Sequence, residues 1–372
     1  MDALHTVIIG GGVVGLACAA VLARRGQPVV VLERNRQLGQ ETSSRNSGVI
    51  HAGLYYPTDS LKARLCLRGR DAIYLRGARD GVPHRQTGKL VVASDAAELP
   101  RLEAIHRQAR ANGAREVELV DGAEVRRRVS AVRAVAGLWS PRTGIVDAHA
   151  LIASYRREAE RLGAVIAVDH AVTGLAPEPA GWQLTVRSGG GSTALACRWL
   201  INAAGLAASE IAALAGVDVD ARGLRQQPCK GDYFVLPARY RDAFPHLVYP
   251  LPFHAGLGVH ITFDLAGRVI AGPDAEYLRD LRYDVDPAKA PSFGAALRHY
   301  LPDITDAELT PGYAGIRPKL QGPSDPFRDF HIAEDAPRLI NLIGIDSPGL
   351  TASEPIAEHV AALIDRGGGP CV

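Results

Sequence analysis

The chain has 372 residues, more than a single hydrophobic core usually holds, so two domains are expected. Hydrophobic residues make up 47% of the sequence and the formal charge is +2, which gives no reason to expect nucleic acid as a partner. The five cysteines have no paired spacing typical of a metal or disulfide framework, so we expect reduced thiols and no metal: Cys18, Cys66, Cys197, Cys229 and Cys371.

The chain opens with the pattern of a dinucleotide-binding turn. Gly10 permits a tight turn after the first strand, Gly12 allows close approach of a pyrophosphate, and Gly15 lets the following helix pack against the strand. The start of that helix, at Val13 and Val14, offers backbone N–H groups and a partial positive charge to phosphates.

Strands at 5–9 and 29–32 flank a helix at 14–25, which is the context that the glycine pattern requires. Glu33 follows the second strand and is placed to bind a ribose hydroxyl. It argues against a 2′-phosphate, although the neighbouring Arg34 weakens that exclusion. The sequence therefore predicts FAD or NAD.

The rest of the chain alternates helices and strands. Helical spacing of apolar residues predicts further helices at 61–77, 96–112, 148–163, 288–300 and 353–366. Apolar, β-branched runs predict strands at 88–94, 164–168, 171–175, 182–187, 199–204, 313–319 and 339–345. The segments DYFVL, HLVYPL, LGVHITF and RVIAG predict an antiparallel sheet, and the tail after Arg366 is expected to be disordered.

This order predicts a mixed α/β (α+β) fold with two discontinuous domains. The first is a Rossmann-type domain that binds the dinucleotide on a central parallel sheet, and the second is a substrate-binding domain with a mostly antiparallel sheet. The expected bounds are 1–84, 146–222 and 322–372 for the first domain, and 85–145 and 223–321 for the second.

Several motifs, in order along nearly the whole chain, resemble one flavoprotein family. They are GGGVVGLACAAVLARRG near the N-terminus, TSSRNSGVIHAGLYYPTDSLKARLC at 42–66, NAAG at 202–205, KGDYF at 230–234, YPLP, GLGVHIT, GIRPK at 315–319 and GIDSPGLTAS at 344–353. With these motifs the chain resembles the L-2-hydroxyglutarate dehydrogenases and oxidases, within the wider D-amino-acid-oxidase-like group. The resemblance implies FAD, and oxidation of a small 2-hydroxy acid, expected to be L-2-hydroxyglutarate, to 2-oxoglutarate by hydride transfer to flavin N5.

The resemblance also implies which residues bind FAD. Residues 43–48 would line the pyrophosphate and flavin, Val172 would contribute backbone contacts in the strand that passes the adenine, and 349–351 would present N–H groups to the flavin's pyrimidine edge. The full implied set is Gly10, Gly12, Val13, Val14, Gly15, Glu33, Arg34, Ser43, Ser44, Asn46, Ser47, Gly48, Val172, Ala204, Gly205, Gly315, Arg317, Gly349, Leu350 and Thr351.

Oxidation of a 2-hydroxy acid needs a carboxylate clamp and a base for the hydroxyl proton. Arg317, in the Gly-x-Arg-Pro pattern, matches the substrate-binding arginine of this group, because a guanidinium makes two parallel bonds to a carboxylate. An ordinary ion-paired arginine is the alternative. His51 and His260 compete for the base. We prefer His51, which follows the segment implied to contact the flavin; a structural role is open for both histidines.

A second carboxylate on the substrate would require further cations or hydroxyl donors. The candidates are Lys62, Lys230, Lys319, Tyr55, Tyr233 and Tyr249. Lys62 also fits a solvent-exposed lysine in the first turn of a helix, and the strand tyrosines also fit core or rim packing.

Two other functions stay open at this point: an amino-acid oxidase of the glycine or sarcosine type, and a flavin- or NAD-binding regulatory module without turnover. Oxygen or a quinone would reoxidise the flavin, and a quinone would require peripheral contact with the inner membrane. No apolar run approaches the roughly 20 residues of a membrane span, and residues 1–20 enter the nucleotide fold directly. We therefore expect a cytoplasmic protein.

Overall fold

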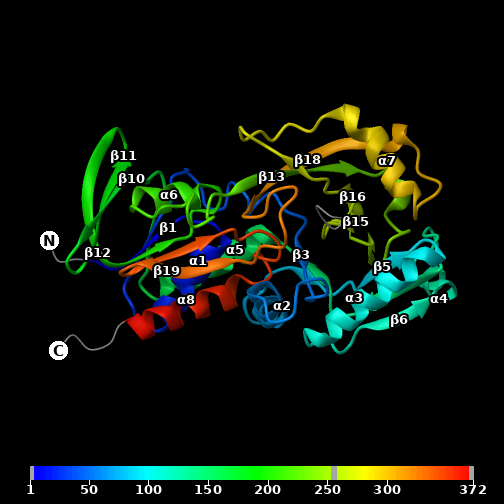
Figure 1. Cartoon of the computed structure of the whole chain (residues 1–372), viewed down its shortest axis with the longest axis horizontal. Coiled ribbons are helices and arrows are strands. Elements are labelled where there is room, and N and C mark those ends of the chain that lie inside the picture. The colour runs from blue at the N-terminus through cyan, green and yellow to red at the C-terminus, as the bar shows by residue number, and fades with distance from the viewer. Residues whose placement is uncertain (1–3, 253–257, 368–372) are drawn as a thin grey trace. The chain divides into compact units, whose positions relative to one another are not determined.

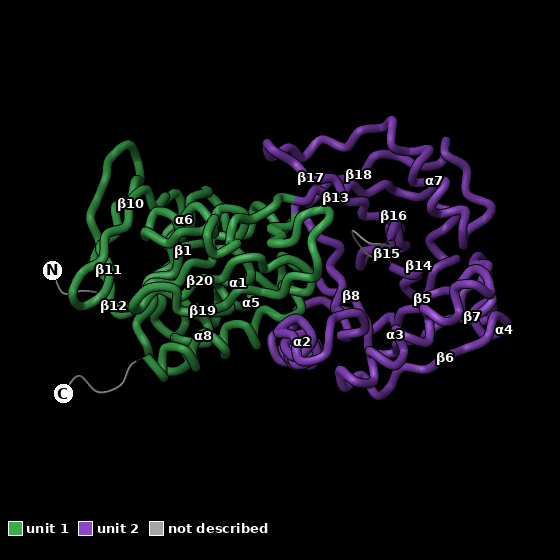
Figure 2. Tube along the Cα trace, viewed as in Figure 1, with its two compact units in different colours: residues 1–44, 148–228, 317–372 green, residues 45–147, 229–316 purple. Residues whose placement is uncertain are grey.

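The computed structural model describes residues 4–252 and 258–367, which belong to two compact units (Figure 2). Unit 1 consists of residues 1–44, 148–228 and 317–372, and unit 2 of residues 45–147 and 229–316. Each unit buries its own cluster of apolar side chains. Stretches far apart in the sequence therefore share one core in each unit.

Unit 1 is built on an eight-stranded sheet (Figure 1). Its strands are β1 (Leu4–Ile9), β2 (Val29–Leu32), β9 (Val165–Ala167), β10 (Ala171–Glu178), β11 (Gly181–Ser188), β12 (Gly191–Asn202), β19 (His331–Ala336) and β20 (Leu339–Ile343). The order is β10-β11-β12-β1-β2-β9, with β20 beside β12 and β19 beside β20. The pairs β12–β1, β1–β2, β2–β9 and β12–β20 are parallel, so the carboxyl ends of these strands meet at one edge.

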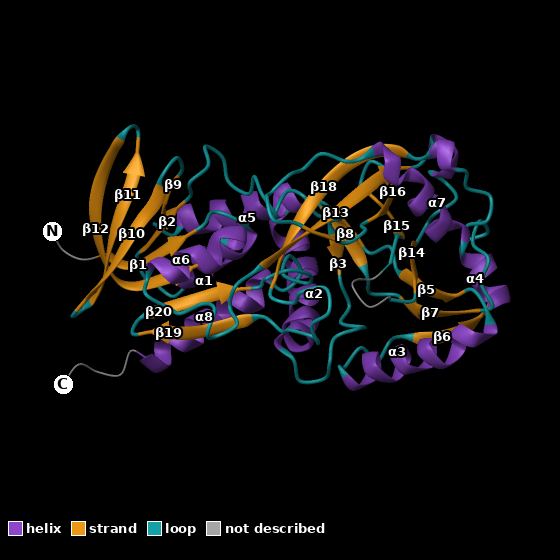
Figure 3. Ribbon diagram, turned by 45° about the horizontal axis from the view of Figure 1, so that its top comes forward, coloured by secondary structure: helices purple, strands orange, loops and turns teal. Residues whose placement is uncertain are grey.

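Helices cover this sheet (Figure 3). They are α1 (Val13–Arg24), α5 (Ala148–Arg161), the short 3₁₀ turn η2 (Gly205–Ala207), α6 (Ala208–Leu214) and α8 (Ser353–Gly367). α1 packs against α5 and α8, whereas α6 contacts β10, β12 and β20. The small residues Ala17, Ala19 and Ala20 in α1 are fully buried, which lets both neighbouring helices approach closely.

Unit 2 is built on a nine-stranded, mostly antiparallel sheet. Its strands are β5 (Lys89–Ala93), β6 (Glu118–Asp121), β7 (Ala136–Ser140), β13 (Gln227–Val235), β14 (Leu247–Pro250), β15 (His260–Phe263), β16 (Val269–Gly272), β17 (Glu276–Tyr277) and β18 (Thr310–Lys319). The order is β17-β13-β16-β15-β14-β5-β7-β6, with β18 beside β13, and β14 pairs with β5 in parallel. A smaller sheet joins β3 (Val49–Ile50), β8 (Gly144–Val146) and β4 (His84–Arg85).

The helices of unit 2 are α2 (Leu61–Asp80), α3 (Leu99–Ala111), α4 (Gly122–Arg128) and α7 (Ala290–Arg298), with 3₁₀ turns η1 (Ala96–Glu98), η3 (Ala238–Tyr240), η4 (Pro287–Lys289) and η5 (Asp306–Glu308). α2 begins where Ser60 Oγ accepts a hydrogen bond from the Ala63 N–H, and it ends at Gly81, whose φ of 69° suits the left-handed cap.

The fold class predicted from the sequence is confirmed, since a central parallel sheet and a mostly antiparallel sheet occur in one mixed α/β chain. The compact units differ from the expected domain bounds chiefly at residues 45–84, which belong to unit 2. β3 pairs with β8, and Arg70 of α2 forms an ion pair with Glu116, so this stretch is tied to unit 2. The expected disordered tail and Cys371 lie outside the described residues.

Within residues 4–252 and 258–367, no helix is long and apolar enough to cross a membrane. The same ranges hold no group of three or more histidine, cysteine and acidic side chains that could bind a metal ion.

Candidate functional site

The first part of the candidate site lies at the carboxyl edge of the parallel strands in unit 1. Ile9 of β1 is opposite Leu32 of β2 and Asn202 of β12, and Asn202 is opposite Asn341 of β20. The turns that follow these strands therefore start side by side. Open α/β sheets bind their ligands at this edge.

The glycine turn after β1 is packed so tightly that side chains would not fit. Gly10 has a φ of 111°, and a Cβ there would collide with the carbonyl oxygen of Ala203. A Cβ on Gly15 would collide with the Gly10 carbonyl oxygen. A Cβ on Gly12 would lie 2.9 Å from Ser43 Oγ. The backbone geometry that the sequence predicts for this turn is present.

The N-terminus of α1 suits an anion. Its N-cap residue, Gly12, has no side chain to serve as a cap, and the first turn holds no acidic residue. Ser43 Oγ accepts a hydrogen bond from the Val13 N–H at 3.0 Å, while Val14 is half-buried. The positive end of the helix dipole is thus unopposed by an acidic side chain of that turn.

Glu33 is buried and held in place by backbone donors. Its Oε2 accepts from the Gly11 N–H at 2.7 Å, and its Oε1 accepts from the backbone and side-chain N–H groups of Asn35, each at 2.8 Å. A carboxylate has about four acceptor positions, so the geometry leaves one for a ribose hydroxyl. Arg34 is exposed and forms an ion pair with Glu41 at 2.7 Å, at the surface of the unit.

Gln226 links two predicted site segments of unit 1 and was not among the predicted residues. Its buried side-chain amide donates to the carbonyl oxygen of Gly205 at 3.0 Å and to that of Pro318 at 3.3 Å. Pro318 follows Arg317, which is half-buried near the end of β18. The structure therefore brings the segment of Arg317 next to the Ala204–Gly205 turn. A glutamine side-chain amide has two N–H donors and can therefore link two carbonyl oxygens, and the sequence offers no other signal for this role of Gln226.

The remaining predicted residues of unit 1 are spread more widely. Gly349, Leu350 and Thr351 lie in the turn before α8, and Thr351 is buried. Ser44 Oγ donates to the carbonyl oxygen of Glu41. Two others lie at strand ends: Val172 near the start of the edge strand β10 and Lys319 at the end of β18.

The predicted cofactor residues of unit 2 form a tight backbone arrangement. Asn46 Oδ1 accepts from the Gly48 N–H at 2.8 Å, and the Asn46 carbonyl oxygen accepts from the Tyr313 hydroxyl at 2.9 Å. Ser47 between them is half-buried. A Cβ on Gly315 would collide with the carbonyl oxygen of the residue before Asn46, so Gly315 allows two chain segments to touch.

Unit 2 brings together four predicted site residues and adds a fifth, Lys89. The ring of His260 stacks on that of Tyr249, with centroids 3.7 Å apart. Lys89 Nζ lies 4.4 Å from the centre of the Tyr249 ring and 4.8 Å from that of Tyr55. His51 is near enough for Lys89 and His260 to affect its pKa. We name these five residues the His–Tyr–Lys cluster.

Burial sets the charge states of this cluster. Burial, aided by the electrostatic effect of the neighbouring Lys89 and His260, lowers the pKa of His51 to about 3. Burial also lowers the pKa of Lys89 to about 7 and raises the pKa of Tyr249 well above its usual value. His51 is therefore neutral at neutral pH, which is the form that accepts a proton.

Sequence reasoning missed Lys89 because it stands in the apolar run GKLVVAS, which was read only as a strand. Every residue of β5 is buried, and Lys89 itself is 0% exposed. It pairs with Leu247 on one side and Ser140 on the other. A single charged residue inside an apolar, β-branched strand was the available signal, because lysine is almost never fully buried without a reason.

Other predicted substrate residues are bound within unit 2. Lys230 Nζ lies 3.0 Å from Asp232 Oδ1 and also donates to the Asp284 carbonyl oxygen, so its charge is balanced inside the fold. Tyr233 stacks on Tyr313, with centroids 4.5 Å apart. Lys62 is buried at the start of α2, which contradicts the alternative of a solvent-exposed lysine there.

The sequence pattern of the family described as FAD dependent oxidoreductase matches residues 5–363. The chain belongs to this family. Its cofactor is FAD, and unit 1 fits that group: the side-chain-free glycine turn, the α1 N-terminus and the buried Glu33 suit the pyrophosphate and ribose of a dinucleotide. The dinucleotide prediction thus resolves to FAD.

The chain is also similar to individual proteins that have a named activity. The chain is 37% identical to the mitochondrial L-2-hydroxyglutarate dehydrogenase of Arabidopsis thaliana, over 97% of this chain and 83% of that one. It is 30% identical to the enzyme of the same name from Caenorhabditis elegans, over 96% and 92% of the two chains. The structure of L-alpha-glycerophosphate oxidase from Mycoplasma pneumoniae with FAD bound is similar, with a TM-score of 0.87, 26% identity and coverage of 98% and 95%.

The comparisons correct one expectation. The predicted cytoplasmic location is wrong on this finding, because the two relatives above are named as mitochondrial proteins. The expectation rested on composition and on the absence of a leader pattern at residues 1–20, and neither feature determines the compartment of an enzyme.

Proposed function

We propose that this protein oxidises a small 2-hydroxy acid, and that the substrate is L-2-hydroxyglutarate, which is converted to 2-oxoglutarate. The observation that carries the proposal is the similarity, over 97% of the chain, to a relative with that named activity. The alternative of a glycine- or sarcosine-type amino-acid oxidase has weaker support. A regulatory module without turnover has no support from an oxidoreductase family.

In this proposal the glycine turn after β1, the N-terminus of α1 and Glu33 would hold the dinucleotide, and His51 and Arg317 act on the substrate. FAD, when bound there, would supply the acceptor for the two electrons that leave the substrate. His51 accepts the hydroxyl proton on the unprotonated nitrogen of its ring, because its lowered pKa keeps the imidazole neutral. Arg317 binds the carboxylate next to the oxidised carbon through two parallel N–H···O bonds.

His260 is the second candidate for the base. Its Nδ1 lies 2.9 Å from the Gly258 carbonyl oxygen, which places the ring proton on Nδ1 and the acceptor lone pair on Nε2. Stacking on Tyr249 fixes the plane of its ring. We assign His260 a positioning role and keep His51 as the base, since the contacts of His260 orient a neighbouring aromatic ring.

Anaerobic mixing tests the proposed function. The purified FAD-loaded protein is combined with L- and D-2-hydroxy acids, including both 2-hydroxyglutarate enantiomers, and with amino acids, while the visible absorbance of the flavin is followed. Bleaching by L-2-hydroxyglutarate alone is expected. Bleaching by glycine or sarcosine would instead establish the amino-acid oxidase, and no bleaching by any compound would overturn both. Oxygen consumption then distinguishes oxygen from a quinone as acceptor.

A further inference from the structure

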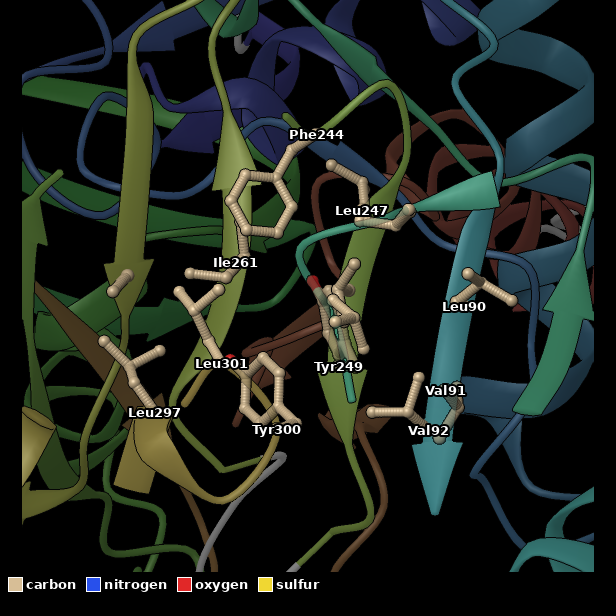
Figure 4. Close-up of a cluster of buried hydrophobic side chains, with 14 of the residues drawn as sticks. Leu90, Val91, Val92, Phe244, Leu247, Tyr249, Ile261, Leu297, Tyr300 and Leu301 are labelled. Carbon is tan, nitrogen blue, oxygen red and sulfur yellow. The ribbon is translucent and has the colours of Figure 1, made fainter. Parts of the chain in front are cut away.

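Lys89 is a buried charge to which the proposed chemistry gives no task. It lies in β5 and is fully buried. Its sequence neighbours Leu90 and Val91, and Tyr249 of β14, belong to the apolar core of unit 2 (Figure 4). Holding an ammonium group in such a place costs free energy unless a partner compensates the lost hydration. A group of this kind is retained for a reason other than packing.

The described residues supply no such partner. Within 4–252 and 258–367, no hydrogen-bond acceptor reaches Lys89 Nζ, and the buried hydroxyls of Tyr55 and Tyr249 also lack partners there. The faces of the two tyrosine rings attract the cation, at 4.8 and 4.4 Å, but they do not accept its three N–H donors in the way that oxygen does.

Two other lysines of unit 2, the buried Lys230 and the half-buried Lys289, show how this protein compensates an ammonium group that has lost hydration. Lys230 is paired with Asp232, and Lys289 contacts Asp232, Asp274 and Glu276 at 2.6, 2.8 and 2.8 Å. Lys89 forms no ion pair of this kind in the part of the chain that the structure describes. The missing anion is therefore specific to the His–Tyr–Lys cluster.

We propose that the Lys89 ammonium and the hydroxyls of Tyr55 and Tyr249 form an anion subsite that binds the substrate carboxylate remote from the oxidised carbon. This inference rests on the proposed function, because only a 2-hydroxy diacid brings a second carboxylate. The ammonium group and the two hydroxyls offer enough donors to fill the roughly four acceptor positions of a carboxylate. An arriving anion also restores the charged form of Lys89, whose pKa burial lowers to about 7.

Calorimetric titration of the FAD-loaded protein with glutarate and pentanoate tests the subsite. Both ligands have five carbons and no hydroxyl group, and they differ by one carboxylate. We expect the wild type to bind glutarate at least about 10-fold more tightly than pentanoate, since a charge-assisted bond is worth about 1.5–3 kcal/mol. Lys89→Met should weaken glutarate binding by about 10- to 100-fold and change pentanoate binding less than about twofold.

Two further variants test whether the loss of glutarate binding depends on the proposed subsite. Arg107→Met on α3 also removes one positive charge from unit 2, but its side chain is 71% exposed, so it should leave glutarate binding unchanged. Tyr55→Phe retains Lys89 and removes one hydroxyl donor, so it should weaken glutarate binding by several-fold. A thermal melt of each variant establishes that it folds.

The outcomes separate the subsite from the reaction. Equal glutarate affinity in wild type and Lys89→Met, or no preference of the wild type for glutarate over pentanoate, overturns the subsite whatever the enzyme oxidises. If Lys89→Met loses glutarate binding and Arg107→Met does not, but L-2-hydroxyglutarate leaves the wild-type flavin unbleached, the proposed function fails and the anion subsite stands.

Discussion

At the residue scale, burial within unit 2 determines the protonation state of His51. Lys89 and His260 add to the burial that holds the pKa of His51 near 3, so this imidazole stays neutral across the physiological range. A neutral imidazole is competent as a base but binds its proton weakly in the absence of substrate. The substrate must supply part of the driving force for proton transfer, and it does so because the hydroxyl becomes more acidic as hydride leaves the carbon that bears it.

Replacing His51 tests the base directly. His51→Asn should lower kcat by about 10²- to 10⁴-fold, which is the usual contribution of general base catalysis, while FAD content stays at the wild-type level. Stopped-flow measurement of flavin reduction by L-2-hydroxyglutarate gives the rate. His106→Asn on α3 is the matched control and should leave the rate unchanged. A loss smaller than about tenfold in His51→Asn would exclude His51 as the base.

The pH dependence of kcat/KM should reflect the pKa values of two members of the cluster, His51 and Lys89. His51 has a pKa near 3, so no fall is expected as the pH decreases from 7 to 5 on its account. Lys89 has a pKa near 7, so its positive charge, and with it the capture of a diacid, is lost as the pH rises through that value. Steady-state rates at constant ionic strength test this. An acid limb near 6.5 would contradict the assignment to His51, and Lys89→Met should abolish the basic limb.

At the element scale, the β1–α1 connection shows how glycine determines the approach of a helix to a strand. The contact between Gly15 and the Gly10 carbonyl oxygen sets the distance at which α1 begins, and Gly10 itself requires a positive φ. The N-terminus of α1 is thereby held at the edge of the parallel sheet. Any side chain at Gly15 would push the helix dipole away from that edge.

Gly15→Ala should therefore weaken FAD binding more than it lowers the free energy of unfolding. Its Cβ meets rigid backbone, so α1 has to shift, and we expect the Kd of FAD to rise by at least about 10-fold, corresponding to about 1.4 kcal/mol. Fluorescence titration of the apoprotein with FAD measures this. Gly191→Ala, whose Cβ would come no closer than 3.9 Å to a backbone oxygen in the β11–β12 hairpin, is the control. Equal Kd values in both variants would show that the turn is not the cofactor contact.

Sequence patterns predicted the elements far better than the cluster in unit 2. The strand–glycine–helix pattern constrains neighbouring residues, so β1, α1 and β2 were found almost to the residue. The positions of Lys89 next to Tyr55 and Tyr249 depend on β5 pairing with β14, which no local pattern predicts. Gln226 was missed for the same reason, because its two acceptors lie 21 and 92 residues away in the chain.

At the scale of the whole molecule, the chain passes from one unit to the other several times, so each unit is assembled from separate stretches of sequence. Residues 45–84 look like a continuation of the nucleotide fold in sequence, but their partners are Ile145 in β8 and Glu116, both in unit 2. The compact units differ from the expected domain bounds there because strand pairing, and not distance from the N-terminus, decides which core a segment joins. The roles that we propose are therefore assigned to individual residues and not to a unit as a whole.

Because Lys89 titrates at a lower pH in the folded protein than in the unfolded chain, its contribution to the free energy of unfolding should depend on pH. A lysine titrates near 10.5 when unfolded but near 7 in this core, so between these values the unfolded chain binds more protons than the folded one. Stability contributed by this group therefore rises as the pH increases from 7 towards 10.5, and the penalty of burial is largest at and below pH 7. Lys89→Met removes the penalty.

The variant should accordingly be more stable than the wild type at pH 7, and its advantage should shrink by about 2 kcal/mol between pH 7 and pH 9. Urea unfolding of the ligand-free, FAD-loaded proteins at both pH values measures the difference. Arg107→Met, which removes an exposed charge, should show no such change with pH. If Lys89→Met is not more stable than the wild type, or if its stability advantage grows with pH, the charge of Lys89 is compensated in the folded protein without a ligand. That result would contradict the proposal that Lys89 forms an anion subsite.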